Sequence, residues 1–270
     1  MYAVCGSAAC RTGRARLRTV TRSIDLNADL GEGLSTDDAL LEVVTSASIA
    51  CGFHAGSPEL MVRIARTAAA RGVAIGAHPS YCDTEGFGRT DMDLPAESLV
   101  AMVAYQVGAM RAAAAVAGTS LRFVKPHGAL YNRAAVDSVV AGAVVEALKI
   151  AGDGTLALLC PSGSALGRRA EAHGVPAFFE AFADRAYRPD GTLLSRSEPG
   201  SVLTDPDAVT QQAMDLATKG TVAAYDGSIV ELKADSICVH GDTPDAVALA
   251  RAVRNALQEA GLSVQSFLKA

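Results

Sequence analysis

The sequence predicts an α/β protein folded as a single (β/α) barrel of about seven strands. From Ile24 onward, short apolar runs alternate with longer helical patterns, which is typical of repeated βα units and a parallel sheet. A chain of 270 residues, half of them hydrophobic, can bury one large core and lies within the size range of α/β barrels. Polar strings that contain histidine follow several of the apolar runs, where a barrel carries its reactive groups.

The predicted elements follow one another in regular order along the chain. Strands are expected over 24–29, 48–51, 73–77, 121–125, 156–159, 177–182 and 236–240. Helices are expected over 58–71, 95–117, 137–151, 163–173, 205–219 and 244–260. Pro58, Pro95 and Pro244 stand near three helix starts, where a missing N–H costs nothing. The Asp226-Gly227 pair predicts a hairpin over 221–232 that is appended to the sheet.

Residues 1–23 differ from the rest of the chain. They carry five arginines and no acidic residue. Three interpretations remain open for this segment: an organelle-targeting peptide, a disordered tail, or an over-extended start. We therefore exclude it from the fold and expect one barrel domain over 24–270.

The overall composition excludes several classes of partner. A net charge of -5 does not supply the basic surface that nucleic acid requires, so a small soluble substrate is favoured. Apolar stretches such as 99–110 and 155–167 are too short and too interrupted to cross a bilayer. The six cysteines form no CxxC pair, which is typical of reduced thiols in a cytoplasmic protein.

The first predicted strand carries three polar residues at every second position. Period-two alternation places Asp25, Asn27 and Asp29 on one face and the apolar residues between them on the other. We interpret them as part of a site. The alternatives are a strand edge that faces water, or a carboxylate that caps the next helix.

His54 and His78 each follow a short apolar run, and glycines at positions 52, 56 and 76 would let the backbone come close to a ligand. Taken alone, either imidazole could equally be a hydrogen-bonded structural group, but their recurrence favours a site. Arg89 ends a loop with two glycines, from which it could reach an anionic group or simply face solvent.

Two further strand ends add cations, acids and imidazoles. Lys125 and His127 share a face across a proline, and an ammonium beside an imidazole suits charge stabilisation with proton transfer and lowers the pKa of the histidine. Glu180, Asp184 and Arg185 stand at another strand end, although the last two could form only a local ion pair. His240 is the last residue of the seventh predicted strand.

Six strings in this chain resemble the LamB/YcsF family of lactam-utilisation proteins, the family of the 5-oxoprolinase A-subunits. The strings are DLNADLGEG at 25–33, IACGFHAG at 49–56, GAHPSY at 76–81, KPHGALYN at 125–132, FEAFADR at 179–185 and ADSICVHGD at 234–242. They occur in the family's order from about residue 23 to the end of the chain. Several strings of this length are far more specific than one short motif.

The resemblance implies a hydrolase that opens the lactam of 5-oxo-L-proline to L-glutamate at the expense of ATP, in a complex with two further subunits, B and C. It also implies a barrel related to those of polysaccharide deacetylases and glycoside hydrolases. ATP would bring Mg²⁺ with it. No GxxxxGK[ST] loop occurs here, so the nucleotide binds either the partner subunits or this chain in a way that no motif reveals.

The candidate catalytic residues are the polar groups at the strand ends: Asp25, Asn27, Asp29, His54, His78, Lys125, His127, Glu180, Asp184, Arg185 and His240. We hypothesise that Asp29 or His127 activates water and that Lys125 and Arg185 stabilise phosphate or developing oxyanion charge. We assign His54, His78 and His240 as groups that position the reactants or relay protons.

Two alternative functions stay open at this point. In the first, Asp29, His54 and His127 hold a divalent metal ion for the deacetylation of a carbohydrate or an amide. In the second, the chain is a non-catalytic subunit that only presents the lactam to its partners, although the number of titratable groups argues against this.

Overall fold

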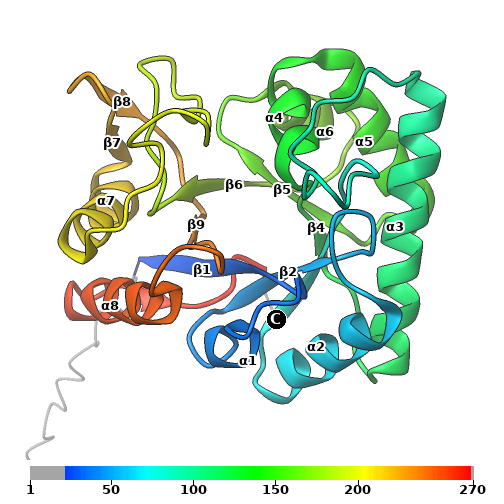
Figure 1. Ribbon diagram of the computed structural model, residues 1–270, viewed down its shortest axis with the longest axis horizontal. Coiled ribbons are helices and arrows are strands. Elements are labelled where there is room, and N and C mark those ends of the chain that lie inside the picture. The colour runs from blue at the N-terminus through cyan, green and yellow to red at the C-terminus, as the bar shows by residue number, and fades with distance from the viewer. Residues whose placement is uncertain (1–21, 269–270) are drawn as a thin grey trace, which may run out of the picture.

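Strand β1 (Ser23–Leu30) closes the barrel, because it pairs in parallel with both β2 (Ser46–Ala50) and β9 (Ser236–Cys238). This computed structural model describes residues 22–268, and its strands run in the order β1-β2-β3-β4-β5-β6-β9 around the barrel (Figure 1). The remaining strands are β3 (Ala74–His78), β4 (Phe123–Val124), β5 (Ala157–Pro161) and β6 (Ala177–Phe182). The predicted seven-stranded α/β barrel is therefore confirmed.

The six predicted helices are present, and their ends differ from the predicted ends by no more than two residues. They are α2 (Pro58–Ala70), α3 (Ala96–Val116), α5 (Ser138–Gly152), α6 (Ala165–Ala172), α7 (Pro206–Lys219) and α8 (Ala246–Glu259). The start of α7 is fixed by its cap, because the Asp205 side chain accepts a hydrogen bond from the Ala208 N–H. These helices form the outer layer around the strands (Figure 1).

Three short elements were not predicted. They are α1 (Asp37–Leu40), α4 (Gly128–Val136) and β10 (Ser263–Val264). Helix α4 begins directly after His127, inside a string that we interpreted only as a site loop. Strand β10 pairs in parallel with the start of β1, which begins at Ser23. The rest of the arginine-rich segment, residues 1–21, lies outside the described residues.

The predicted hairpin exists, but its position in the fold was wrong. Strands β7 (Thr221–Ala223) and β8 (Ile229–Glu231) pair antiparallel as a separate two-stranded sheet. They cannot join the barrel sheet, because β6 and β9 already pair with each other and leave no open edge between them.

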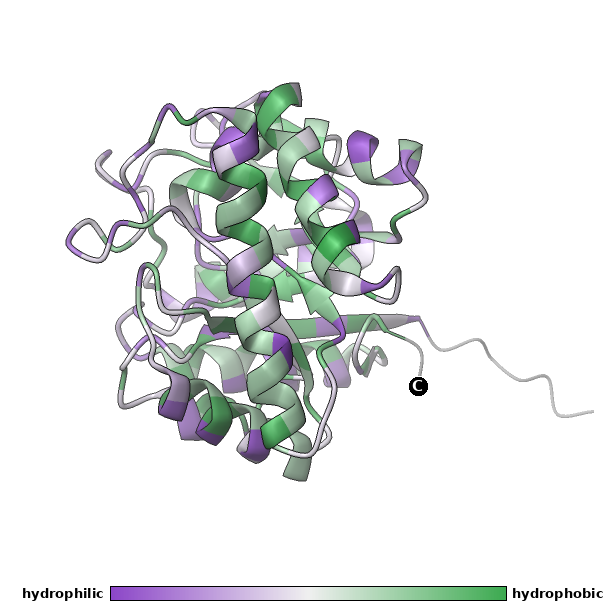
Figure 2. Cartoon of the chain, turned by 90° about the vertical axis from the view of Figure 1, so that its right-hand side faces the viewer, coloured by the Kyte–Doolittle hydropathy of each residue, from purple (hydrophilic) through white to green (hydrophobic). Residues whose placement is uncertain are grey.

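Helix α3 corrects the expectation that its apolar stretch is short. It runs for 21 residues and is long and apolar enough to cross a membrane by length and composition alone. It is instead a core helix of the barrel, which buries residues such as Leu99, Val107 and Met110 and packs against α2 and α5. Figure 2 shows the largely hydrophobic strands that lie behind the helices on this side of the molecule.

The polar face of β1 points into the barrel. Asp25 and Asn27 are fully buried and Asp29 is 6% exposed, so the alternative of a strand edge facing water is wrong. Gly76 on β3 makes room for a core side chain and not, as we expected, for a ligand. A Cβ at this position would lie 2.3 Å from the ring of Phe123, so glycine is required for core packing.

Candidate functional site

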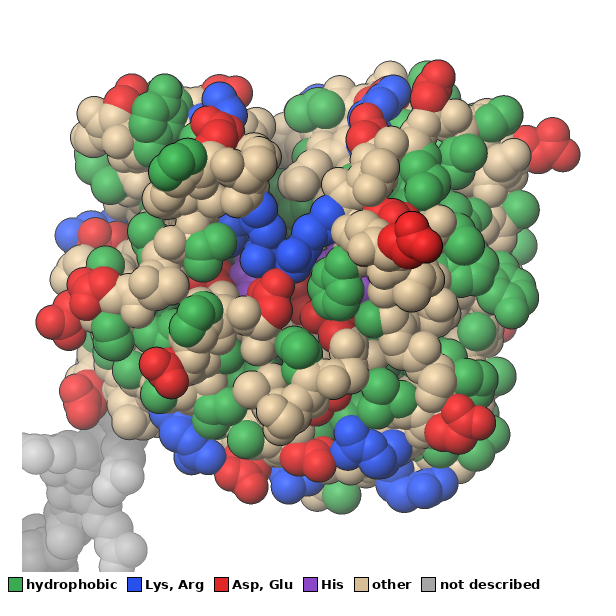
Figure 3. Space-filling view, in the orientation of Figure 1, with side chains coloured by type: hydrophobic (Ala, Val, Ile, Leu, Met, Phe, Trp, Pro, Cys, Tyr) green, Lys and Arg blue, Asp and Glu red, His purple; other side chains and the backbone are tan. Residues whose placement is uncertain are grey.

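A cavity of about 1110 Å³ opens where the barrel strands end. Figure 3 looks into this hollow, in which Lys, Arg and His side chains gather beside acidic ones. Seven of the predicted residues line it: Asp29, His78, Lys125, His127, Glu180, Arg185 and His240. The other four, which are Asp25, Asn27, His54 and Asp184, are buried behind its wall. Parallel strands of a barrel carry their reactive groups at one rim, and predicted residues from 29 to 240 converge there, whereas Asp25 stands at the start of β1.

Lys125 is the centre of an ion-pair network inside the barrel. Its Nζ atom lies 2.8 Å from Asp29 Oδ1 and 2.8 Å from Glu180 Oε1. It also donates to Asn27 Oδ1 at 3.3 Å, and Tyr131 donates to the second oxygen of Glu180. Burial lowers the pKa of Lys125, but the charge of Asp29 and the other anions outweighs burial and holds that pKa well above its usual value. The Lys125 ammonium is therefore charged and paired with the carboxylates of Asp29 and Glu180.

Asp25 lies at the bottom of this interior, surrounded by hydroxyl groups. It accepts hydrogen bonds from Thr45 and Ser46, each at 2.6 Å, and from Ser236. Burial raises its pKa to about 6, although these hydrogen bonds partly oppose the shift. Asp25 therefore supports the wall of the site from below and does not line the cavity.

The raised pKa of Asp25 predicts a pH-dependent stability. The unfolded chain has a carboxyl pKa of about 4, so protonated Asp25 stabilises the fold at low pH, and this contribution is lost as the pH rises through about 6. A shift of about two units corresponds to about 3 kcal/mol. We expect the difference in unfolding free energy between wild type and Asp25→Asn to fall by about that amount between about pH 3 and pH 7 in urea titrations.

The matched control for this prediction is Asp93→Asn, because the Asp93 side chain is 99% exposed. Its difference from wild type should not change over the same pH range. A pH-independent difference for Asp25→Asn would contradict the assignment of a raised pKa to this carboxyl group.

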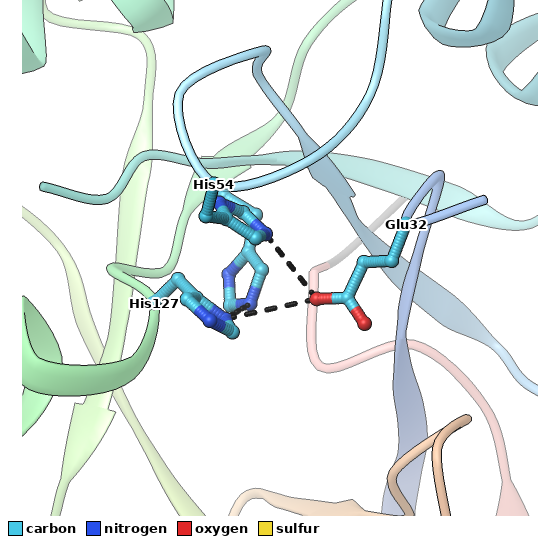
Figure 4. Close-up of side chains that lie close together, drawn as sticks. Glu32, His54 and His127 are labelled. Atoms are coloured by element: carbon cyan, nitrogen blue, oxygen red, sulfur yellow. Dashed lines mark hydrogen bonds and ion pairs between the residues drawn. The ribbon is translucent and has the colours of Figure 1, made fainter. Parts of the chain in front are cut away.

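Three histidines, His54, His78 and His127, come together with Glu32 beside the cavity. Figure 4 shows Glu32 facing His54 and His127. Glu32 Oε1 lies 3.3 Å from His54 Nε2 and 3.7 Å from His127 Nδ1. His127 Nδ1 lies 2.9 Å from His78 Nε2, and the His54 and His127 rings stack with centroids 3.9 Å apart. One ligand atom from each of the four residues lies within 4.8 Å of the others, so this group could hold a metal ion.

The electrostatics of this cluster keep His54 and His127 neutral and make the carboxyl group of Glu32 weakly acidic. Burial lowers the pKa of His54 to about 4. Burial and then the charge of His78 and His54 lower the pKa of His127 well below its usual value, so the direction we predicted is right but Lys125 is not the main cause. Burial and the charge of Asp29 raise the pKa of Glu32 to about 7.

The metal-ligand set that we predicted, Asp29 with His54 and His127, is not the group that the structure brings together. Asp29 belongs to a second group with Cys238 and His240. Burial raises the pKa of the Cys238 thiol well above its usual value, so this sulfur is protonated and a poor metal ligand. The cluster around Glu32 is the better candidate metal site.

His240 lines the cavity just after β9 and is oriented by the buried carboxylate of Asp184. Its Nδ1 lies 2.9 Å from Asp184 Oδ1, and the ring stacks on Phe182. Burial alone would raise the pKa of Asp184, but the charge of His240 and hydrogen bonds from His240 and Thr243 lower it to about 2. Asp184 therefore pairs with His240, and the local ion pair with Arg185 that we considered is wrong.

Arg185 is a buried cation at the cavity wall. Its guanidinium donates to the carbonyl oxygens of Ser201 and Leu194. Within residues 22–268, no carboxylate lies within ion-pair distance of it. Burial and the charge of Arg196 lower its pKa to about 10, so it stays charged at neutral pH. A charged guanidinium in this position suits a bound anion.

Several residues of the site were missed by the sequence analysis. Glu32 stands only three residues after Asp29, and this spacing at a strand end was the signal that could have identified it. Tyr131, Ser236 and Cys238 contact the predicted residues but stand in apolar or helical contexts that carry no such signal. At the rim of the cavity, the carboxylate of Asp242 forms ion pairs with Arg196 at 3.2 Å and with Arg89 at 2.6 Å. Neither Arg196 nor Asp242 was predicted.

The chain is similar to known proteins over almost its whole length. The model of the LamB/YcsF family matches residues 24–270. A 5-oxoprolinase A-subunit of Pseudomonas syringae pv. tomato is 51% identical over 251 residues, which are 91% of this chain and 98% of that protein. The 5-oxoprolinase A-subunit of Streptomyces griseus subsp. griseus is 53% identical over 249 residues, 90% of this chain and 99% of that protein.

A solved structure has the same fold. The crystal structure of a lactam utilization protein from Thermus thermophilus superposes with a TM-score of 0.84 at 43% sequence identity. The match covers 90% of this chain and 99% of that protein.

Proposed function

The chain belongs to the LamB/YcsF family, and from this premise we propose that it is the A-subunit of an ATP-dependent 5-oxoprolinase. It acts in the cytoplasm with subunits B and C and opens the ring of 5-oxo-L-proline to give L-glutamate. The observation that carries this proposal is the roughly 50% identity to proteins named as 5-oxoprolinase A-subunits over nine-tenths of the chain.

The chemistry explains why ATP is needed. An unstrained five-membered lactam is a poor electrophile, and its nitrogen is a poor leaving group. Transfer of a phosphoryl group from ATP to the lactam oxygen gives an imidate-like phosphate whose carbon water can attack. The C–N bond then breaks and the nitrogen takes a proton, which leaves an acyl phosphate of glutamate. A second water hydrolyses this acyl phosphate, so that ATP, 5-oxoproline and two water molecules give glutamate, ADP and phosphate.

The cationic side of the cavity suits this substrate. Both 5-oxoproline and its phosphorylated form are anions, and Arg185 presents a buried charge without a carboxylate partner among the described residues. We assign Arg185 to the binding of the substrate's carboxylate or phosphoryl oxygens, with Arg89 and Arg196 at the rim. Lys125 is less suited to this role than we expected, because its ammonium is already shared between Asp29 and Glu180.

His240 is the best placed group for proton transfer. Asp184 holds its Nδ1, which leaves Nε2 for the reacting groups in the cavity. Asp29 is less suitable because it is paired with Lys125 and His78, and the charges of these two groups outweigh burial and keep the pKa of Asp29 well below its usual value. His127 has both ring nitrogens engaged, one with Phe87 O and one with His78.

Reconstitution tests the proposal directly. Purified chain is mixed with subunits B and C, ATP, Mg²⁺ and 5-oxoproline, and glutamate and ADP are measured separately. We expect glutamate release only when all three subunits and ATP are present. The same mixture with the Arg185→Met variant should require a higher concentration of 5-oxoproline. Glutamate release that does not depend on this chain would contradict the proposal.

One alternative function to test is metal-dependent deacetylation. The cluster of Glu32 with three histidines supports it, because deacetylases of N-acetyl sugars can use such groups to hold a metal ion. Turnover of an N-acetylated sugar without ATP would favour that function. A third function, in which the chain only presents the lactam to its partners, is favoured if complexes with His240→Ala and Arg185→Met chains retain full activity.

A further inference from the structure

Glu32, His54, His78 and His127 form a cluster to which the proposed reaction assigns no role. Glu32, His54 and His127 follow strands β1, β2 and β4, and His78 is the last residue of β3, so their side chains meet only in the folded barrel. The three imidazoles are 1–6% exposed, and the Glu32 side chain is 4% exposed. The four side chains therefore form a buried polar cluster and not a group of solvent-exposed side chains.

Hydrogen bonds on the outer side of the cluster fix which ring nitrogens carry hydrogen. His78 Nδ1 lies 2.7 Å from the carbonyl of Lys125, and His127 Nε2 lies 2.9 Å from the carbonyl of Phe87. A carbonyl can only accept, so both nitrogens must be donors. His54 Nδ1 faces the hydroxyl of Ser80, which itself donates to a carbonyl, so this nitrogen is also a donor.

The inner nitrogens of the three rings converge. They are His54 Nε2, His78 Nε2 and His127 Nδ1, and the last two are only 2.9 Å apart. His78 Nε2 also lies 3.3 Å from Asp29 Oδ2, so this crowded group of nitrogens and carboxylate oxygens needs a cation among them, either a metal ion or a proton. Donation of the outer N–H to a carbonyl or hydroxyl is the arrangement that orients imidazoles toward a metal ion.

The spacing of the inner atoms agrees with a tetrahedral ion. With bonds of about 2.0–2.1 Å, neighbouring ligand atoms lie about 3.3–3.4 Å apart. Three separations, 2.9 Å between His78 and His127, 3.3 Å from His54 to Glu32 and 3.7 Å from His127 to Glu32, bracket that value, and all four ligand atoms lie within 4.8 Å of one another. Three nitrogens with one oxygen suit Zn²⁺ and similar ions, whereas Mg²⁺ prefers oxygen ligands.

We propose that Glu32, His54, His78 and His127 bind one divalent transition-metal ion of the Zn²⁺ class. This site is separate from any Mg²⁺ that accompanies ATP. Three of its residues line the cavity, and a bound ion of this class polarises an oxygen or activates water. It also ties the loops that follow four strands together at the mouth of the barrel.

The test uses the whole chain, stripped with a chelator and then equilibrated with Zn²⁺ or with Co²⁺ as a spectroscopic probe. We expect about one ion per chain by mass spectrometry and the visible absorption of tetrahedral Co²⁺. His54→Ala should weaken Zn²⁺ binding by more than about 100-fold. His173→Ala is the matched control, because His173 is exposed at the end of α6 and should leave binding unchanged.

A second variant keeps all four ligands. Gly88 has φ of +67°, and a Cβ there would lie 2.8 Å from His127 Cδ2 and 2.9 Å from His54 Cβ. Gly88→Ala should therefore displace two ligands and change the Co²⁺ spectrum while the far-UV circular dichroism stays the same. The proposal is overturned if wild type takes up no stoichiometric ion, or if His54→Ala binds Zn²⁺ as tightly as His173→Ala. In those cases the cluster holds a shared proton instead.

Discussion

Lys125→Met should lower the free energy of unfolding by about 3–5 kcal/mol. Lys125 is 2% exposed, and its ammonium is shared by two carboxylates, each 2.8 Å away. Methionine keeps the length of the apolar stem but leaves Asp29 and Glu180 without their common cation inside the barrel. A buried charge without a partner costs much more than the ion pair itself contributes, so the loss comes mainly from the stranded carboxylates.

Urea titration of the variant measures this loss. Lys149→Met is the matched control, because Lys149 is exposed on α5, and it should change stability by no more than about 0.5 kcal/mol. If stranded charge is the cause, adding Glu180→Gln to Lys125→Met should restore part of the stability. A loss below about 1 kcal/mol, or no recovery in the double variant, would show that the network matters little.

The sequence predicted the barrel well because its signal is local and repeated. Each strand is a short apolar run and each helix a longer periodic one, so the seven strands and six helices could be located before the topology was known. Helix α4 was missed because its first residues, Gly128 and Ala129, follow the polar string around His127 and hide the helical pattern. The place of the β7–β8 hairpin depends on closure of the barrel, which no local pattern reports.

The sequence indicated which residues gather at the site better than it indicated which of them bind one another. Strand-end positions identified the residues that converge, because all parallel strands end at one rim. The partners could not be predicted, because they depend on which loops meet in space. Asp184 lies beside Arg185 in sequence but bonds to His240, 56 residues away. Glu32 joins three histidines from other loops, and no spacing in the chain encodes that contact.

His240→Ala should lower the kcat of the reconstituted enzyme by about 10²–10⁴-fold, which is the contribution typical of a positioned acid or base. The ring lies in the cavity wall, is fixed by Asp184 at 2.9 Å and stacks on Phe182. Among residues 22–268, the other histidines that line the cavity, His78 and His127, belong to the cluster around Glu32. The KM for 5-oxoproline should change little, since we assign the binding of the anion to Arg185 and the rim arginines.

Asp184→Asn separates orientation from proton transfer. The carboxamide has nearly the same shape, but its NH₂ group cannot accept one of the hydrogen bonds that His240 and Thr243 now donate to the carboxylate. We therefore expect a lower kcat, a KM close to that of wild type and an unchanged amount of bound Zn²⁺. His173→Ala, at an exposed position, should match wild type in all three measurements. If His240→Ala keeps kcat within about threefold of wild type, proton transfer belongs to another group, and the first candidates are then Asp29 and His127.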